Sequence, residues 1–190
     1  SGGEELKERA IFFDRDGTIN VEKEYIYEPD QVELIPGSLE GLRLASEAGF
    51  RLFVVSNQSG IARGLATETD VCRVNERLEE LVAMAGVKFD GVYFCPHLPT
   101  ISGHCDCRKP KRGMVDKALE TFDLDLSNSF VIGDRLLDMR LAHTIGATGI
   151  MVRTGYGSVE EQLIEADGRP AHVVNDLLEA VKLILRGEKT

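Results

Sequence analysis

Short apolar runs alternate along the chain with longer segments whose apolar residues recur every three or four positions. Strands buried on both faces of a sheet are indicated by nearly continuous apolar runs at 10–13, 52–55, 91–94, 129–132 and 149–152. Helices are expected at 39–48, 67–85, 113–122, 136–145, from 158, and at 176–186. This alternation predicts an α/β fold with a doubly wound, mostly parallel sheet.

Polar residues at the ends of the periodic segments predict where the helices begin. Ser38 is the expected N-cap of the first helix, Thr67 with Asp70 forms a capping pattern for the second, and Ser158 caps a later one. The segment 19–36 is long, mixed and partly alternating, which suggests a flap-like hairpin. In such sheets the ligand lies beyond the carboxyl ends of the strands, so this hairpin would cover the site.

Length and composition fit one globular domain over residues 1–190, since 43% of the 190 residues are hydrophobic and 28% are charged. The opening Ser-Gly-Gly at 1–3 looks like an expression-tag remnant. No segment has the roughly 20 apolar residues of a membrane span, and the start resembles no secretory signal. A cytoplasmic protein without a membrane partner is therefore expected.

The net charge of −10 argues against nucleic acid as a partner, because a phosphate backbone requires a basic surface. A small anionic substrate is still compatible with this charge if the few cations gather at one place. No coiled-coil pattern or apolar stripe suggests an obligate partner, so we expect a monomer.

Polar motifs follow three of the predicted strands, and a fourth motif precedes a helix. These motifs are Asp14-Arg15-Asp16-Gly17-Thr18, Ser56-Asn57, Arg108-Lys109 and Gly133-Asp134. Each motif alone occurs commonly in turns and caps. Because the carboxyl ends of parallel strands meet at one edge of the sheet, we expect the four to converge there.

Together these motifs contain the groups that phosphoryl transfer requires. Asp14 can attack phosphorus, while Asp16 donates a proton to the leaving oxygen and later activates water. Magnesium would reduce the repulsion between carboxylate and phosphate, with Asp14, Asp134 and the backbone carbonyl of Asp16 as its ligands. The Ser56 hydroxyl and the Lys109 ammonium would hold the transferred phosphoryl group.

A cysteine-rich loop precedes the lysine motif. Cys95, His97, Cys105 and Cys107 form a complete ligand set for a structural zinc ion, which would pin the loop 95–107 and fix Lys109. His104 is an alternative ligand with poorer spacing, and a pair of buried cysteines beside a loop histidine is the alternative without metal. Cys72 is expected to be a small apolar residue on a helix.

The four motifs, with Asp138 four residues after Asp134, resemble those of the haloacid dehalogenase superfamily of phosphohydrolases, from about residue 10 to past 155. The resemblance implies a Rossmann-like core with Asp14 as nucleophile and Asp16 as acid/base. It also implies that Ser56 and Lys109 stabilise the phosphoryl group, that Asp134 binds the metal, and that Asp138 orients Lys109 or a metal-bound water. The motif spacing leaves no room for a cap domain.

Within the superfamily the chain resembles the D-glycero-D-manno-heptose 1,7-bisphosphate phosphatases, which remove the C7 phosphate. The matching segments are Asp14 to Asn20, Ser56 to Gly64, Cys95-Pro96-His97 and Cys105 to Pro110. The resemblance implies a phosphorylated sugar substrate whose distal phosphate or sugar is held by Arg108 and Arg135. The other residues that it implies for substrate binding are Glu22, Lys23, Glu24, Tyr25, Asn57, Gln58, Ser59 and Arg63.

Other functions share parts of this pattern. Histidinol-phosphate phosphatases have the same zinc loop, and a polynucleotide 3′-phosphatase would use the same chemistry, although the acidic balance disfavours it. A phospho-acceptor signalling domain has no need of an acid/base two residues after its acceptor aspartate. A zinc-stabilised binding module would be favoured by a missing motif residue, and none is missing.

Overall fold

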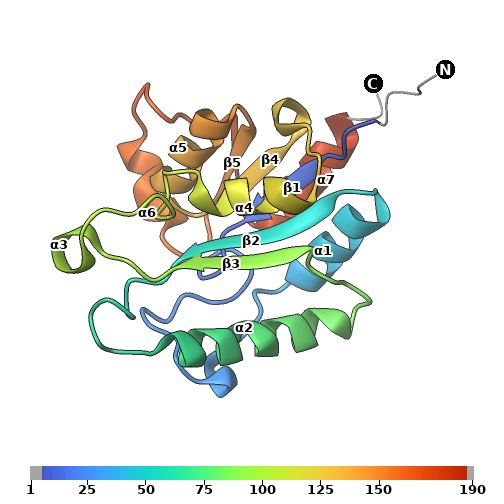
Figure 1. Cartoon of the computed structure of the whole chain (residues 1–190). Helices are drawn as coiled ribbons and strands as arrows, with labels where there is room; N and C mark the ends of the chain where they lie inside the picture. Colours follow the sequence, from blue (N-terminus) through green and yellow to red (C-terminus); the bar gives the residue numbers. More distant parts are fainter. Residues whose placement is uncertain (1–5, 188–190) are drawn as a thin grey trace.

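The computed structural model describes residues 6–187, so the tag-like residues 1–3 lie outside the described part. Its six strands form one sheet in the order β3-β2-β1-β4-β5-β6, and all neighbouring strands run parallel (Figure 1). The strands are β1 (Ala10–Phe13), β2 (Arg51–Asn57), β3 (Gly91–Cys95), β4 (Phe130–Gly133), β5 (Thr148–Val152) and β6 (His172–Val174). The predicted doubly wound α/β fold is confirmed.

Helices cover both faces of the sheet. The longer ones are α1 (Ser38–Glu47), α2 (Glu68–Ala83), α4 (Gly113–Thr121), α5 (Leu136–Ile145) and α7 (Leu177–Gly187). The short ones are α3 (Pro99–Ser102) and α6 (Gly157–Glu160), with 3-10 turns η1 (Pro29–Gln31), η2 (Leu126–Asn128) and η3 (Glu161–Leu163). Between residues 6 and 187 no cap domain is inserted, as predicted.

Two apolar cores lie on opposite faces of the sheet, and strand β1 contributes to both. Ile11 and Phe13 pack into the core under α1, α2 and α7, whereas Ala10 and Phe12 pack into the core under α4 and α5. Complete burial of a side chain of the size of Ile or Phe contributes about 1.5–3 kcal/mol. The two cores therefore fix the β1 backbone, and with it the residue that follows Phe13.

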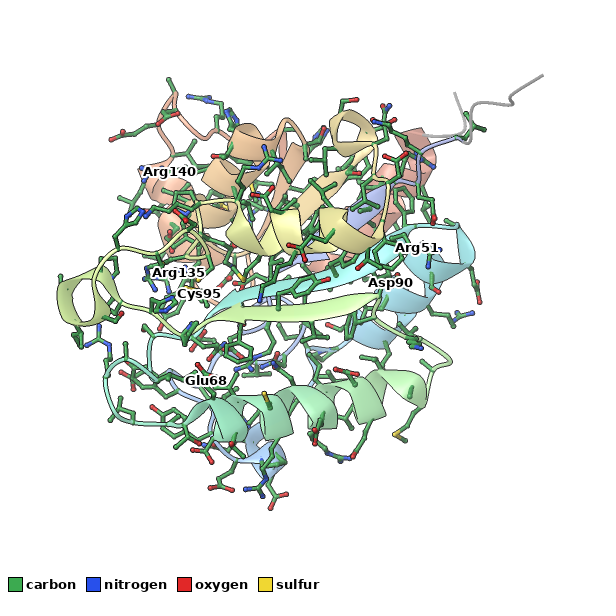
Figure 2. All side chains as sticks on the ribbon, viewed as in Figure 1. Arg51, Glu68, Asp90, Cys95, Arg135 and Arg140 are labelled. Atoms are coloured by element: carbon green, nitrogen blue, oxygen red, sulfur yellow. The ribbon has the colours of Figure 1, made fainter. Side chains whose placement is uncertain are left out.

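The strand order reverses between β1 and β4, which makes the crevice between their carboxyl ends the expected ligand position. The Asp14 N–H donates to the carbonyl of Ile132 (3.0 Å), so the two strand ends are held in register. In Figure 2, Cys95 and Arg135 lie at this end of the sheet, and the Arg51–Asp90 ion pair (2.8 Å) lies at the opposite end.

The helix starts agree only in part with the capping residues. Thr67 caps α2 as predicted, because its Oγ1 accepts from the Asp70 N–H (3.1 Å) and the Asp70 carboxylate accepts from the Thr67 N–H (2.9 Å). The prediction for Ser38 is wrong: Gly37 is the N-cap, and the Ser38 hydroxyl donates to the Ile19 carbonyl (2.8 Å). Ser158 is also wrong, because α6 begins at Gly157 without a side-chain cap.

The segment 19–36 is a loop with antiparallel pairing only at its base. The Val21 N–H donates to the Glu33 carbonyl (2.7 Å), and the Ile35 N–H donates to the Ile19 carbonyl (3.0 Å). The rest of the segment contains the turn η1 and no strand, so the predicted hairpin is limited to this base. Within the described part of the chain, no helix has the length and apolar content to cross a membrane.

Candidate active site

Three buried carboxylates meet where β1 and β4 end. Asp14 follows β1, Asp134 follows β4, and Asp138 lies in the first turn of α5, with carboxylate oxygens within 4.8 Å of one another. Asp134 and Asp138 are 0% exposed and Asp14 is 7% exposed. Mutual repulsion of buried anions is unfavourable unless a cation compensates it. Such an all-oxygen donor set fits a hard divalent cation.

The electrostatics of this cluster show the same need for a cation. Burial raises the pKa of Asp134 to about 10, and the charges of Asp14 and Asp138 add to the effect. Burial and the Asp14 charge raise the pKa of Asp138 to about 7, although Lys109 opposes the shift. Protons therefore compensate part of the charge when no metal is bound.

Two glycines allow the loops to close tightly around Asp134. A Cβ atom on Gly17 or on Gly155 would lie 2.2 Å from the Asp134 Oδ2 atom, and both glycines have positive φ angles (83° and 56°). The same Oδ2 accepts from the Tyr156 N–H (2.9 Å). One oxygen of Asp134 is thus oriented by the loop that follows β5.

Lys109 lies beside the carboxylates and is 3% exposed. Its Nζ is 2.9 Å from Asp14 Oδ1 and 2.7 Å from Asp138 Oδ1. Burial lowers the pKa of Lys109, but the two carboxylates outweigh burial and raise the pKa above its ordinary value. Asn57, at the end of β2, holds the Lys109 backbone by accepting from its N–H (3.0 Å) and donating to its carbonyl (3.4 Å).

Asp16 lies outside this cluster of three carboxylates and is paired with Arg15. The Arg15 Nε and one terminal nitrogen each donate to a different oxygen of Asp16 (3.0 Å for both). Asn20 (2.9 Å) and Gln58 (3.2 Å) also donate to it. Burial raises the pKa of Asp16, but the Arg15 charge and these hydrogen bonds outweigh burial and hold the pKa below its ordinary value. The Gln58 amide also donates to the Ser56 hydroxyl (3.1 Å), so it links two of the predicted catalytic residues.

A cavity of about 370 Å³ opens above Asp14 and Asp16. Its walls contain nine of the ten residues predicted to bind substrate, namely Glu22, Glu24, Tyr25, Asn57, Gln58, Ser59, Arg63, Arg108 and Arg135. Lys23 is the exception: its Nζ donates to the Gln31 carbonyl (2.9 Å) and pairs with Glu33 (3.2 Å), outside this cavity.

Cationic residues gather at the cavity even though the chain is acidic overall. Arg63, Arg108 and Arg135 all line it. The Arg135 guanidinium pairs with Glu160 (3.0 Å) and lies 4.4 Å from the centre of the Tyr156 ring. Glu22 also lines the cavity, and burial together with the Asp16 charge raises its pKa to about 7. The cavity can therefore hold an anion with several hydroxyl groups.

Sequence reasoning missed three residues of the cavity wall, Gly60, Leu137 and Tyr156. Tyr156 had a usable signal, because it closely follows β5 and so stands at the same edge of the sheet as the other motifs. Leu137 gave no such signal, since an apolar residue in the first turn of a helix reads as core.

The four predicted zinc ligands are brought together beside the cavity. Cys95, His97, Cys105 and Cys107 have ligand atoms within 4.8 Å of one another, and the Cys95 and Cys105 sulfurs are 3.8 Å apart. Zinc–sulfur bonds of about 2.3 Å in a tetrahedron require sulfurs about 3.8 Å apart, which this pair matches, whereas the Cys95 and Cys107 sulfurs, 2.8 Å apart, would have to separate on binding. The donor set of three thiolates and one imidazole fits zinc. His104 lies outside the cluster and pairs with Asp106 (3.2 Å). The Arg108 guanidinium donates to the His97 carbonyl (3.3 Å), which ties the cavity wall to this cluster.

Comparison with known proteins agrees with this geometry. The chain matches the family model for polynucleotide kinase 3 phosphatase over residues 9–140 and the HAD-hydrolase-like model over residues 106–180. It is 41% identical over 182 residues to the D-glycero-beta-D-manno-heptose-1,7-bisphosphate 7-phosphatase of Yersinia pestis, covering 92% of this chain and 94% of that protein. The enzyme of the same name from Escherichia coli (strain K12) is 40% identical, with 95% of each chain covered.

Solved structures show the same relationship. The D,D-heptose 1,7-bisphosphate phosphatase of B. bronchiseptica, determined with magnesium and phosphate, superimposes with a TM-score of 0.85 at 29% identity, covering 94% of this chain and 99% of that one. The chain therefore belongs to the haloacid dehalogenase-like hydrolases, in the family described by the polynucleotide kinase 3 phosphatase model, and among its members to the D-glycero-beta-D-manno-heptose-1,7-bisphosphate 7-phosphatases.

Proposed function

We propose that this protein hydrolyses the C7 phosphate of D-glycero-β-D-manno-heptose 1,7-bisphosphate through an aspartyl-phosphate on Asp14. The observation that carries the proposal is the position of Asp14, which contacts Lys109 at the floor of a cavity lined by three arginines. The names of relatives about 40% identical support the substrate and its β anomer.

The orientation of Asp14 supports its role as nucleophile. Its Oδ1 accepts from Lys109 Nζ and from the Arg15 N–H (2.9 Å for both), so the carboxylate is held with one oxygen bound. In the first step the other oxygen forms a bond to phosphorus while the bond from phosphorus to the sugar oxygen breaks. Lys109 and Ser56 stabilise the charge on the transferred group.

Asp16 completes the proton transfers. Without substrate, Arg15 and the hydrogen bonds hold the pKa of Asp16 below its ordinary value. The negative charge of the bound phosphate opposes this shift and lets Asp16 take up a proton. Asp16 then donates that proton to the departing sugar oxygen, and later takes a proton from the water that attacks the phosphorus of the aspartyl-phosphate. Phosphate leaves and Asp14 returns to its carboxylate form. Asp138 keeps Lys109 in place through the 2.7 Å contact.

Two metals fit the residues described. Magnesium would be held by Asp14, Asp134 and the backbone carbonyl of Asp16, and it would supply positive charge between nucleophile and phosphate. Zinc would be held by Cys95, His97, Cys105 and Cys107. Because these protein ligands would fill all four tetrahedral positions of the ion, its role would be structural.

The arginines suit a substrate with a second phosphate. Arg108 and Arg135, with Arg63 beside them, would bind the C1 phosphate through paired N–H donors. Glu22, Glu24, Tyr25, Asn57, Gln58 and Ser59 would contact the sugar, because they line the rest of the wall. Lys23 is not included, since its side chain is engaged outside the cavity.

The test is phosphate release with Mg²⁺, comparing kcat/KM for both anomers of the heptose bisphosphate, histidinol phosphate and a 3′-phosphorylated oligonucleotide. The oligonucleotide is included because of the polynucleotide phosphatase family model. We expect the β bisphosphate to exceed the others by at least about tenfold, a difference of about 1.4 kcal/mol in transition-state binding. Preference for histidinol phosphate or the oligonucleotide would contradict the substrate while leaving the mechanism intact.

A further inference from the structure

Arg15 is a charged residue whose side chain is buried in the middle of the site, with only 1% of the residue exposed. A buried cation requires compensating partners. The guanidinium meets this need on two sides: its Nε and one terminal nitrogen bind Asp16, and the other terminal nitrogen donates to the Asn75 Oδ1 (2.8 Å). The side chain is thus held between the turn after β1 and helix α2.

The contact with Arg15 fixes the orientation of the Asp16 carboxylate in addition to lowering its pKa. Two parallel N–H donors reach different oxygens of Asp16, both at 3.0 Å. This bidentate geometry sets the plane of the carboxylate, which a single contact would not do. Rotation of Asp16 about its terminal torsion would break both hydrogen bonds together.

The outer end of Arg15 is anchored on a rigid element. Asn75 is 6% exposed and lies on the buried face of α2, between the core residues Val71, Val74 and Leu78. Helix α2 is itself fixed by the apolar core on that face of the sheet. The Arg15 guanidinium therefore links the Asp16 carboxylate to helix α2, and Asn75 on that helix is 60 residues from Arg15 in sequence.

The remaining donors to Asp16 show which of its oxygens is available to substrate. Asn20, 1% exposed, donates to Oδ1, whereas Gln58 donates to Oδ2 from the cavity wall. The Gln58 contact, at 3.2 Å, is the longest of the four donor contacts. Oδ2 is therefore the Asp16 oxygen that is bound by a residue of the cavity wall, and displacement of the Gln58 amide would free one of its two hydrogen-bonding positions for a leaving oxygen.

We infer that Arg15, anchored by Asn75, is the positioning residue that aims Oδ2 of Asp16 at the leaving oxygen. The inference rests on the proposed function, because it assigns a role in the proton transfer that this function requires. As the phosphorus–oxygen bond to the leaving group breaks and the bond to Asp14 forms, the proton passes from Asp16 to the leaving oxygen. Arg15 keeps its own protons throughout and acts on the leaving oxygen only through Asp16, whose Oδ2 accepts from one of its terminal nitrogens (3.0 Å).

The test uses esters whose leaving groups differ in their need for a proton. An alkyl phosphate releases an alkoxide that must be protonated, whereas 4-nitrophenyl phosphate releases a stable anion. The measured quantity is kcat/KM, which covers the steps up to formation of the aspartyl-phosphate. Arg15→Met should lower kcat/KM for the alkyl ester about 10- to 100-fold more than for the aryl ester, within the range of general-acid contributions.

Three further variants separate positioning from charge and from stability. Arg15→Lys keeps the charge without the fork, so it should show the same selective loss; recovery of the wild-type ratio would overturn bidentate positioning. Asn75→Leu keeps the Arg15 side chain but removes its anchor, so it should show a smaller selective loss of kcat/KM for the alkyl ester. Val74→Ala, the neighbouring core position on α2, should lower stability and leave the alkyl-to-aryl ratio unchanged.

A double-mutant cycle decides the case even if the Arg15 variants are poorly stable. In an Asp16→Ala background, Asn75→Leu should have no further effect on the ratio, since the carboxylate that it positions is absent. Equal loss on both esters in every variant would overturn the inference while the proposed function stands. A wild-type protein that hydrolyses neither ester nor the heptose bisphosphate would overturn the proposed function and this inference with it.

Discussion

Lys109 illustrates, at the scale of single residues, how much of the site the sequence can predict. Its type and its place after a cysteine-rich loop indicated a phosphoryl ligand, and the structure places its ammonium between Asp14 and Asp138. The position of Asp16 against Arg15 could not be predicted, because it depends on Asn75, which is distant in sequence. Motif residues at strand ends are predictable because the sheet brings them together, whereas the side-chain orientations depend on packing.

The role of Asp14 gives the first prediction. Asp14→Asn removes the attacking oxygen charge and should reduce turnover of the heptose bisphosphate below detection, while circular dichroism and zinc content stay as in the wild type. The amide is nearly isosteric, so the fold should not respond. Asp123→Asn, the same change at an exposed position outside the cavity, is a matched control that should leave turnover unchanged. Full turnover by Asp14→Asn would exclude Asp14 as nucleophile.

The raised pKa of Asp134 gives a prediction on pH. In the metal-free protein this pKa rises from 3.8 to about 10, so at neutral pH the folded chain holds a proton that the unfolded chain does not. The group's contribution to stability is therefore present below about pH 3.8 and is lost as the pH rises towards 10.

Binding of Mg²⁺ should displace this proton. We expect proton release in calorimetric titrations with Mg²⁺ in buffers of different ionisation enthalpy, and an affinity that rises with pH across the neutral range. Asp134→Asn should weaken Mg²⁺ binding and reduce the proton release to the part that Asp138 contributes. Proton-independent Mg²⁺ binding by the wild type would place the metal elsewhere.

At the scale of elements, the helices and the long strands were predictable because their periodicities are strong. Strand β6 was missed because it has three residues and only two of them are apolar. The predicted caps Ser38 and Ser158 failed for a related reason: a serine near a helix start can bind another segment, as Ser38 binds Ile19. At these helix starts, tertiary contacts outweigh the local preference of serine for the N-cap position.

In the zinc loop, residues 95–107, loss of one predicted ligand should be the most informative change. Cys107→Ser should lose zinc and lower the melting temperature, and it should reduce kcat/KM through displacement of Arg108 and Lys109. Zinc content is measured by atomic emission. Cys72→Ser is the control, since Cys72 is exposed on α2 and should change neither zinc content nor activity. Unchanged zinc content in Cys107→Ser would refute the ligand assignment.

At the scale of the whole molecule, the two apolar cores share one sheet. Strand β1 sends alternate side chains into each core, so neither core can be lost without exposing the other. The single-domain organisation remains a prediction, and so do the monomeric state and the cytoplasmic location. The order of the strands could not be read from the sequence alone, because it depends on which crossovers reverse direction.

Because the two cores share strand β1, we predict that the protein unfolds cooperatively. In scanning calorimetry the zinc-loaded protein should give one transition whose calorimetric and van't Hoff enthalpies agree. Saturating Mg²⁺ at 100 times its dissociation constant should stabilise the folded state by about 2.7 kcal/mol without splitting the transition. Two separate transitions would show that the cores unfold independently.

The paired glycines beside Asp134 have a consequence for how this protein tolerates change. Gly17 and Gly155 lie where even a methyl group would collide with the Asp134 carboxylate. Neither residue has a side chain that could take part in chemistry, yet replacement by alanine at either position should be as damaging as loss of an acidic group. In a library of random variants, the map of forbidden substitutions would therefore extend beyond the reactive residues to two positions that carry no side chain.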